Sequence, residues 1–103
     1  MGKNRIIKTI VKFVSNLIEH KIISKYGERL YAKHFVDSEI TAYRDSAIGE
    51  ASEYNWNESE KASIRLQSIE KAKSGLKRDY PDVKFSDNDL LFFADETMKE
   101  VLG

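Results

Sequence analysis

The N-terminal stretch of the chain alternates apolar and polar positions with the period of an α-helix. At about 100° per residue, apolar side chains spaced three and four apart fall on one face. That face contains Ile6, Ile10, Phe13 and Leu17, widened by Ile7, Val11, Val14, Ile18 and Ile22. The opposite side carries Arg5, Lys8, Thr9, Lys12, Ser15, Asn16 and Glu19. The pattern predicts an amphipathic helix over residues 4–24, with Gly27 as its stop or as a kink.

Residues 28–54 predict either one long helix or two helices in tandem. Apolar and aromatic residues recur there at helical steps, and they are Leu30, Tyr31, His34 and Phe35, then Val36, Ile40, Tyr43, Ala47, Ala51 and Tyr54. Asp37 and Ser38 are residue types that cap a fresh helix start. Gly49 weakens a helix interior by up to about 1 kcal/mol relative to alanine. The pattern is compatible with both arrangements.

Two further helices are predicted from their N-terminal capping pairs. In each pair, Asn57 with Glu60 and Ser86 with Asp89, a capping side chain precedes a carboxylate by three residues, as in a capping box. The first of these helices runs to about Asp79, because Pro81 prevents continuation. The predicted inward positions are Ala62, Leu66, Ile69, Leu76 and Tyr80, then Leu90, Leu91, Phe93, Ala94, Met98 and Val101.

These elements predict an all-α fold class, a small bundle of four or five helices. Asp82–Phe85 is predicted as a short extended link, in which Val83–Phe85 is a strand candidate, and the length of 103 residues fits one helical domain over residues 1–103. A chain this short needs the apolar side of its first helix for the core. We therefore expect that side to face the core rather than a membrane.

Charge alternates along the chain in blocks that track the predicted helices. Residues 1–36 carry a net charge of +6, residues 37–60 of −6, residues 61–84 of +4 and residues 85–103 of −4. Oppositely charged helices can lie side by side and form surface pairs, each contributing about 0–1 kcal/mol. Alternatively, one basic and one acidic face stay exposed and meet a partner, or another copy head-to-tail. We favour surface pairing, and the overall neutrality gives no general attraction to nucleic acid or anionic membrane.

The sequence contains no recognisable catalytic or metal-binding motif. The lack of cysteine excludes disulfides and thiolate metal sites. His20 and His34 do not have metal-ligand spacing, and Asp87–Asn88–Asp89 lacks the alternating ligands of a calcium loop. Arg44–Asp45–Ser46 has no histidine placed by sequence to activate the serine. We therefore predict a non-enzymatic protein with no catalytic residue, no metal and no cofactor.

No segment predicts export or a membrane span. The apolar N-terminal stretch is interrupted by Lys8, Thr9, Lys12, Ser15 and Asn16, so it lacks the unbroken core of a signal peptide. No run approaches the ~20 apolar residues of a membrane span. The expected location is cytoplasmic.

Aromatic and charged residues supply the candidate partner-binding positions. Trp56 lies in a polar break between two predicted helices, and tryptophan and tyrosine are favoured at binding surfaces. We therefore expect Trp56 to make an exposed contact. The candidate partner-binding residues are Trp56, Tyr54, Glu50, Glu53, Glu58, Lys8 and Lys12.

Residues 47–102 resemble the soluble C-terminal region of the LLH family of phage holins. The resemblance is carried by Ala47–Ile48–Gly49–Glu50–Ala51, Glu60–Lys61, Leu66, Leu76, Val83–Lys84–Phe85–Ser86–Asp87, Phe93–Ala94–Asp95 and Met98. Holins of that family begin with a membrane-spanning helix, whereas this chain has a charged amphipathic helix there. The resemblance therefore implies a phage or prophage origin and a shared helical module, without membrane permeabilisation and without transferable functional residues.

Together these features predict a protein that binds a protein partner through charged helical faces. Homo-oligomerisation is compatible with this function. The alternative is a peripheral membrane-associated protein that uses its basic amphipathic N-terminal helix. Nucleic-acid binding through the same helix comes third and is the least expected.

Overall fold

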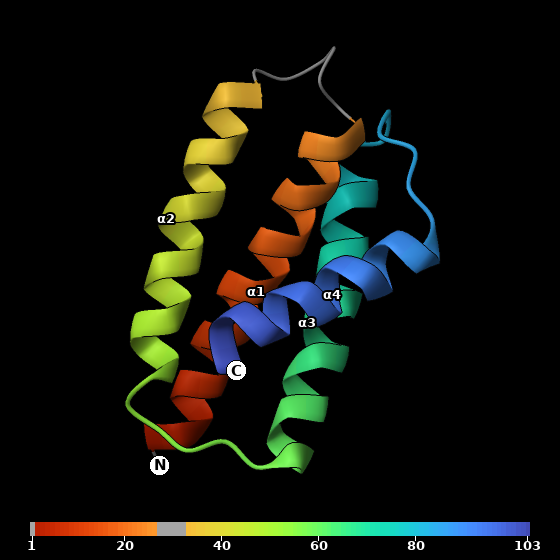
Figure 1. Ribbon diagram of the computed structural model, residues 1–103. Coiled ribbons are helices and arrows are strands. Elements are labelled where there is room, and N and C mark those ends of the chain that lie inside the picture. The colour runs from red at the N-terminus through yellow and green to blue at the C-terminus, as the bar shows by residue number, and fades with distance from the viewer. Residues whose placement is uncertain (1, 27–32) are drawn as a thin grey trace.

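The chain folds into four α-helices, shown in Figure 1. The computed structural model describes the backbone of residues 2–26 and 33–103, and the side chains of residues 3–26 and 40–103. The helices are α1 (Gly2–Tyr26), α2 (Lys33–Ala51), α3 (Glu58–Asp79) and α4 (Asp87–Leu102). No strand occurs in the described part of the chain, so the predicted all-α bundle is confirmed.

The four helices are arranged around α1. Figure 1 shows α2 and α3 on either side of α1, with α2 running in the opposite direction to α1, α3 running in the same direction as α1, and α4 crossing in front of α1. α1 packs against each of the other helices, while α2 and α3 do not meet within the described residues. α4 thus crosses the other helices obliquely instead of completing an up-and-down bundle. The Cα radius of gyration is 13.3 Å, close to the ~13 Å expected for a folded domain of this length.

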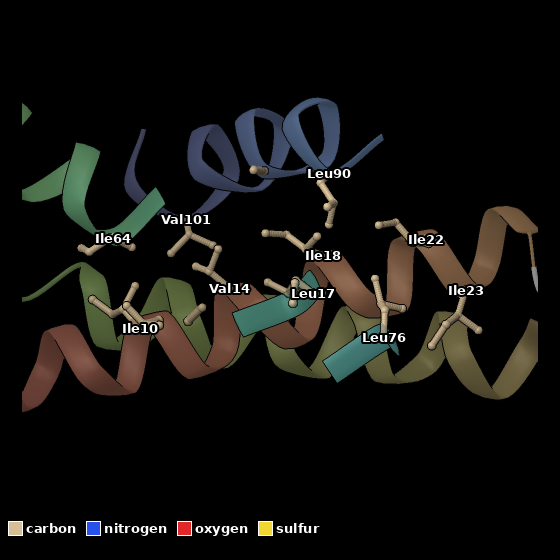
Figure 2. Packing of buried hydrophobic residues seen from close by; sticks show 14 of the residues in the cluster. Ile10, Val14, Leu17, Ile18, Ile22, Ile23, Ile64, Leu76, Leu90 and Val101 are labelled. Atoms are coloured by element: carbon tan, nitrogen blue, oxygen red, sulfur yellow. The ribbon is translucent and has the colours of Figure 1, made fainter. Parts of the chain in front are cut away.

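The central position of α1 follows from its wide apolar face. Ile10, Val14, Leu17, Ile18 and Ile22 are fully buried, and Figure 2 shows their side chains pointing toward those of Ile64, Leu76, Leu90 and Val101. Burial of each such side chain stabilises the fold by about 1.5–3 kcal/mol. The predicted helix over residues 4–24 is confirmed, with its apolar side in the core.

α2 is one continuous helix over Lys33–Ala51. The alternative of a fresh start at Asp37 and Ser38 is wrong, because the backbone of both residues lies inside α2. Tyr54 lies beyond the end of α2. The predicted stop at Gly27 and the apolar positions Leu30 and Tyr31 lie outside the described residues, as do the side chains of His34, Phe35 and Val36.

Both predicted capping boxes are present. The Asn57 side chain accepts a hydrogen bond of 2.8 Å from the Glu60 backbone N–H, and the Asn57 N–H donates to the Glu60 carboxylate at 3.0 Å. Ser86 and Asp89 make the same reciprocal pair at 3.2 and 3.0 Å. These bonds satisfy N–H groups that a helix start leaves without partners. They fix where α3 and α4 begin.

The predicted inward positions are wrong at three places. Ala62, Leu66 and Leu91 are exposed. The buried face of α3 consists of Ile64, Ser68, Ala72, Gly75 and Leu76. Small residues dominate this face because they let α1 approach closely, so the larger Leu66 lies at the edge. Val83–Phe85 forms no strand, but Val83 is buried and helps to anchor the link between α3 and α4.

Candidate protein-interaction surface

The acidic residues of α4 pair with basic residues of both α1 and α3. The ion pairs are Lys21–Glu96 (2.9 Å), Lys21–Glu100 (2.7 Å), Lys25–Asp89 (3.2 Å), Arg65–Asp95 (2.7 Å) and Lys73–Asp87 (3.2 Å). The acidic block of residues 85–103 therefore lies between the two basic blocks of the sequence. For α4, the prediction of side-by-side pairing is confirmed.

Lys21 is the most enclosed of these charges. Its side chain is 8% exposed, and its ammonium also donates a hydrogen bond of 3.0 Å to Thr97 Oγ1. The three donors of the ammonium match the three acceptors Thr97, Glu96 and Glu100. This site was not predicted from the sequence, although Lys21 lies seven residues after Val14 and so in line with the apolar face of α1.

The acidic block around α2 is largely left unpaired. Within the described residues, Asp45, Glu50, Glu53 and Glu58 form no ion pair, and Glu60 alone of this block binds a lysine, Lys3, at 3.0 Å. The capping bond from the Asn57 backbone and the contact with Lys3 lower the pKa of Glu60. The surface pairing expected for this acidic block is therefore not found at these four residues.

Trp56 lies at the junction of α2, α3 and the start of α1. It is half-buried against the core, its indole Nε1 donates a hydrogen bond of 3.0 Å to the Ala51 carbonyl, and the Lys3 ammonium lies 5.0 Å from the ring centroid. Tyr54 packs on its ring at 5.9 Å. Trp56 is thus half-buried rather than exposed as expected, and these contacts give the side chain a role in joining the helices, while its contact with a partner stays a prediction.

The seven candidate residues do not form one site. Trp56 and Tyr54 contact each other, while Glu50 is half-exposed on α2 and Glu53 is exposed just after it. Glu58 borders a hollow of about 290 Å³ between α3 and α4. Lys8 and Lys12 are exposed on α1, and neither forms an ion pair within the described residues.

Three of the exposed large apolar side chains in the described residues lie on α4 and on the edge of α3. Phe92 is 63% exposed, Leu66 57% and Leu91 42%. Leu66 lies seven residues before Lys73, which binds Asp87 of α4, so helical periodicity places Leu66 on the side of α3 next to α4. We call Leu66, Leu91 and Phe92 the α4 ridge. The sequence analysis counted Leu66 and Leu91 as core, and the signal it missed was the adjacent pair Leu91–Phe92, since one face of a helix cannot bury both together with Leu90.

Carboxylates surround the ridge. On the helical surface, Glu96 lies one turn after Phe92, and Asp95 lies one turn after both Leu91 and Phe92. The side chains of Asp87, Asp95 and Glu96 stay 78%, 61% and 43% exposed despite their ion pairs. The ridge therefore presents apolar groups beside exposed carboxylates, each of which is paired with a basic side chain of α1 or α3.

Glu19 is a half-buried carboxylate at the contact between α1 and α3. Burial raises its pKa to about 7, with His20 acting in the opposite direction. A Cβ atom on Gly75 would lie 2.8 Å from Glu19 Oε1, so the absence of a side chain at Gly75 makes room for the carboxyl group. His20 itself packs on Tyr43 at 5.4 Å and places its Nδ1 2.7 Å from the Asn16 carbonyl.

Asp89 joins the end of α1 to the start of α4. It accepts hydrogen bonds from the Tyr26 hydroxyl at 2.8 Å and from the Lys25 ammonium at 3.2 Å, in addition to its capping bonds with Ser86. These bonds, led by that from the Ser86 backbone, lower the pKa of Asp89 to about 2. The residue predicted only as a helix cap also connects two helices.

In the described part of the chain, no three histidine, aspartate or glutamate side chains gather to hold a metal ion. None of the described helices combines the length and apolar character needed to cross a membrane. Comparisons with protein-family models, curated proteins and solved structures found no significant match to this chain.

Proposed function

We propose that this chain is a non-enzymatic protein-interaction module whose α4 ridge binds a protein partner. The observation that carries the proposal is Phe92, a large aromatic side chain left 63% exposed beside exposed Leu91. Exposed apolar patches with a polar rim are typical of protein interaction sites, and aromatic residues supply much of their binding energy.

The surroundings of the ridge indicate the chemistry of the partner. Asp87, Asp95 and Glu96 are exposed next to it, so a partner surface that combines apolar groups with lysine or arginine would be complementary. The charged faces inferred from the sequence are part of this proposal, because Glu50, Glu53 and Glu58 around α2 form no ion pair within the described residues.

The membrane-surface alternative has less support from the structure. It required the apolar side of α1, which is the side that the bundle buries. Only the basic outer residues of α1 would remain for an anionic surface, and without an inserted apolar face such binding is weak. The cytoplasmic location and the phage or prophage origin stay predictions within this proposal.

The proposal is tested by comparing three immobilised forms of the protein for capture of partners from a lysate of the source organism. The forms are wild type, Phe92→Ser, and the matched control Ile48→Ser, which changes an exposed apolar residue of α2. A protein retained by wild type and by the control but lost with Phe92→Ser supports the proposal. Identical sets of captured proteins from all three forms would contradict it.

A further inference from the structure

A second charged surface lies on the side of the molecule away from α4. Arg5, Lys8 and Lys12 are exposed on α1 and form no ion pair within the described residues; we call them the basic strip. Lys12 precedes Lys21 by nine residues, which is two and a half helical turns. Because Lys21 binds α4, Lys12 projects from the opposite side of α1.

A hollow lies beside the strip, between α1 and α3. Its volume is about 550 Å³, and it is bordered by Lys8, Val11, Gln67, Glu70, Lys71 and Ser74. Lys8 stands on one wall and Lys71 on the other, while Val11 supplies a buried apolar floor. With Arg5 and Lys12 beside it, the hollow has a basic border that outweighs its single acidic residue, Glu70.

The hollow and the α4 ridge are complementary in chemistry. The ridge offers an exposed aromatic ring with carboxylates around it, and the hollow offers an apolar floor with lysines around it. Leu66 lies one turn before Glu70 on α3 and so lies next to the hollow, but Leu91 and Phe92 lie on α4 and do not line the hollow of their own chain. The zero net charge of the chain leaves no long-range repulsion between copies.

We propose that the occupant of the hollow is the α4 ridge of a second copy of this chain. The interface is heterologous, because the ridge of one copy meets the hollow of the next, and each copy keeps one free ridge and one free hollow. This inference rests on the proposed function in so far as it uses the same ridge. It specifies that one partner is the protein itself.

Sedimentation velocity over a range of protein and salt concentrations tests the association. The wild type should associate as its concentration rises and dissociate as salt is added, because exposed charges are screened. Phe92→Ser alone, or Lys8→Glu with Lys12→Glu, should each weaken association by at least about tenfold. Lys77→Glu, which changes an exposed lysine outside the hollow, should leave association unchanged. Circular dichroism of each variant shows whether it is folded.

Mixing the two defective forms gives the sharpest readout. The Phe92→Ser protein keeps its hollow and the Lys8→Glu/Lys12→Glu protein keeps its ridge, so the mixture should form a heterodimer that does not grow further. A wild type that stays monomeric at all concentrations overturns the inference. So does an association that depends on Phe92 but not on the lysines, since two ridges would then be meeting.

Two results would distinguish a failure of this inference from a failure of the proposed function. If the wild type is monomeric yet captures a partner that Phe92→Ser loses, this inference fails and the proposed function stands. If the monomer instead pellets with phosphatidylserine vesicles, and Lys8→Glu/Lys12→Glu abolishes pelleting, the basic strip binds anionic lipid and self-association is overturned.

Discussion

Lys21 of α1 and Glu100 of α4 form an ion pair of 2.7 Å in which the lysine is almost fully enclosed. The same ammonium binds Glu96 and Thr97, so one side chain fixes α4 across α1 over its last two turns. A buried charge of this kind specifies position, because any other placement of α4 would leave the ammonium without partners.

Replacing Lys21 with methionine should lower the free energy of unfolding by about 2 kcal/mol. The loss is smaller than for a fully buried pair, because Glu96 and Glu100 are partly exposed and water can replace the lysine. Urea unfolding followed by the fluorescence of Trp56, the single tryptophan, measures it. Lys12→Met, at an exposed lysine without an ion pair in the described residues, should change stability by less than about 0.5 kcal/mol. Equal stabilities for the two variants would contradict this role of Lys21.

Glu19 should make the protein less stable as the pH rises from about 5 to 8. Its pKa is about 7 in the folded protein and 4.5 in its ordinary state, so between these values the folded chain binds more protons than the unfolded one. Stability therefore falls as pH rises through this window, by about 1–2 kcal/mol once solvent screening is allowed for. Glu19→Gln should remove the slope, and Glu70→Gln, at an exposed position on α3, should keep it. Thermal unfolding across the pH range measures the slope in both variants.

Asp89 changes the stability of the protein in a separate pH range. Because its pKa is about 2 in the folded protein and 3.8 in its ordinary state, its contribution to stability is complete above about pH 4 and is lost as the pH falls toward 2. The slope assigned to Glu19 is therefore measured without interference from Asp89.

Gly75→Ala should reduce the same pH slope although Glu19 itself is not mutated. The new Cβ would lie 2.8 Å from Glu19 Oε1, so the flexible carboxyl group must move toward solvent and its pKa must fall. The alanine also favours the helix by about 1 kcal/mol. We expect higher thermal stability than wild type at pH 8, with a smaller gain at pH 5. A gain that is the same at both pH values would show that the two residues are not coupled.

Ser68→Ala should stabilise the protein by about 1 kcal/mol. The Ser68 Oγ atom is buried in α3 and has no hydrogen-bond partner among the described residues. Removing it eliminates the desolvation cost of the hydroxyl and leaves a side chain that fits the same space. Ser74→Ala, at an exposed position of the same helix, gives the contribution of helix propensity alone. If Ser68→Ala is less stable than wild type in urea unfolding, the hydroxyl has a bond that stabilises the fold.

Trp56→Phe should lower the free energy of unfolding by about 1 kcal/mol, because it removes the hydrogen bond from Nε1 to the Ala51 carbonyl and keeps an aromatic ring. Trp56→Ala should lower the free energy of unfolding by about 3 kcal/mol, since the packing and the contact with Lys3 are also lost. Thermal unfolding followed by circular dichroism provides the comparison. Equal losses for phenylalanine and alanine would mean that the ring itself contributes little.

Local sequence determined where most of the helices lie and where α3 and α4 begin. The period of Ile10, Val14 and Leu17 is a property of α1 alone, and the capping pairs Asn57–Glu60 and Ser86–Asp89 act within three residues of chain. Such short-range interactions are formed by neighbours in sequence, so they can be recognised without the fold. For the same reason the all-α class and the burial of the apolar side of α1 followed from the pattern.

Tertiary structure decided which face of each later helix is buried and which charges meet. Leu66 and Leu91 share the apolar character of core residues, but α3 buries the face of Ser68, Ala72 and Gly75 and α4 buries the face of Leu90 and Ala94, which leaves both leucines exposed. Lys21 became the connection between α1 and α4 because α4 crosses α1 there, whereas Asp45 and Glu50, the acidic residues of α2 whose side chains are described, form no ion pair. These outcomes depend on contacts between residues far apart in the chain, and helical periodicity alone does not specify which helices pack together.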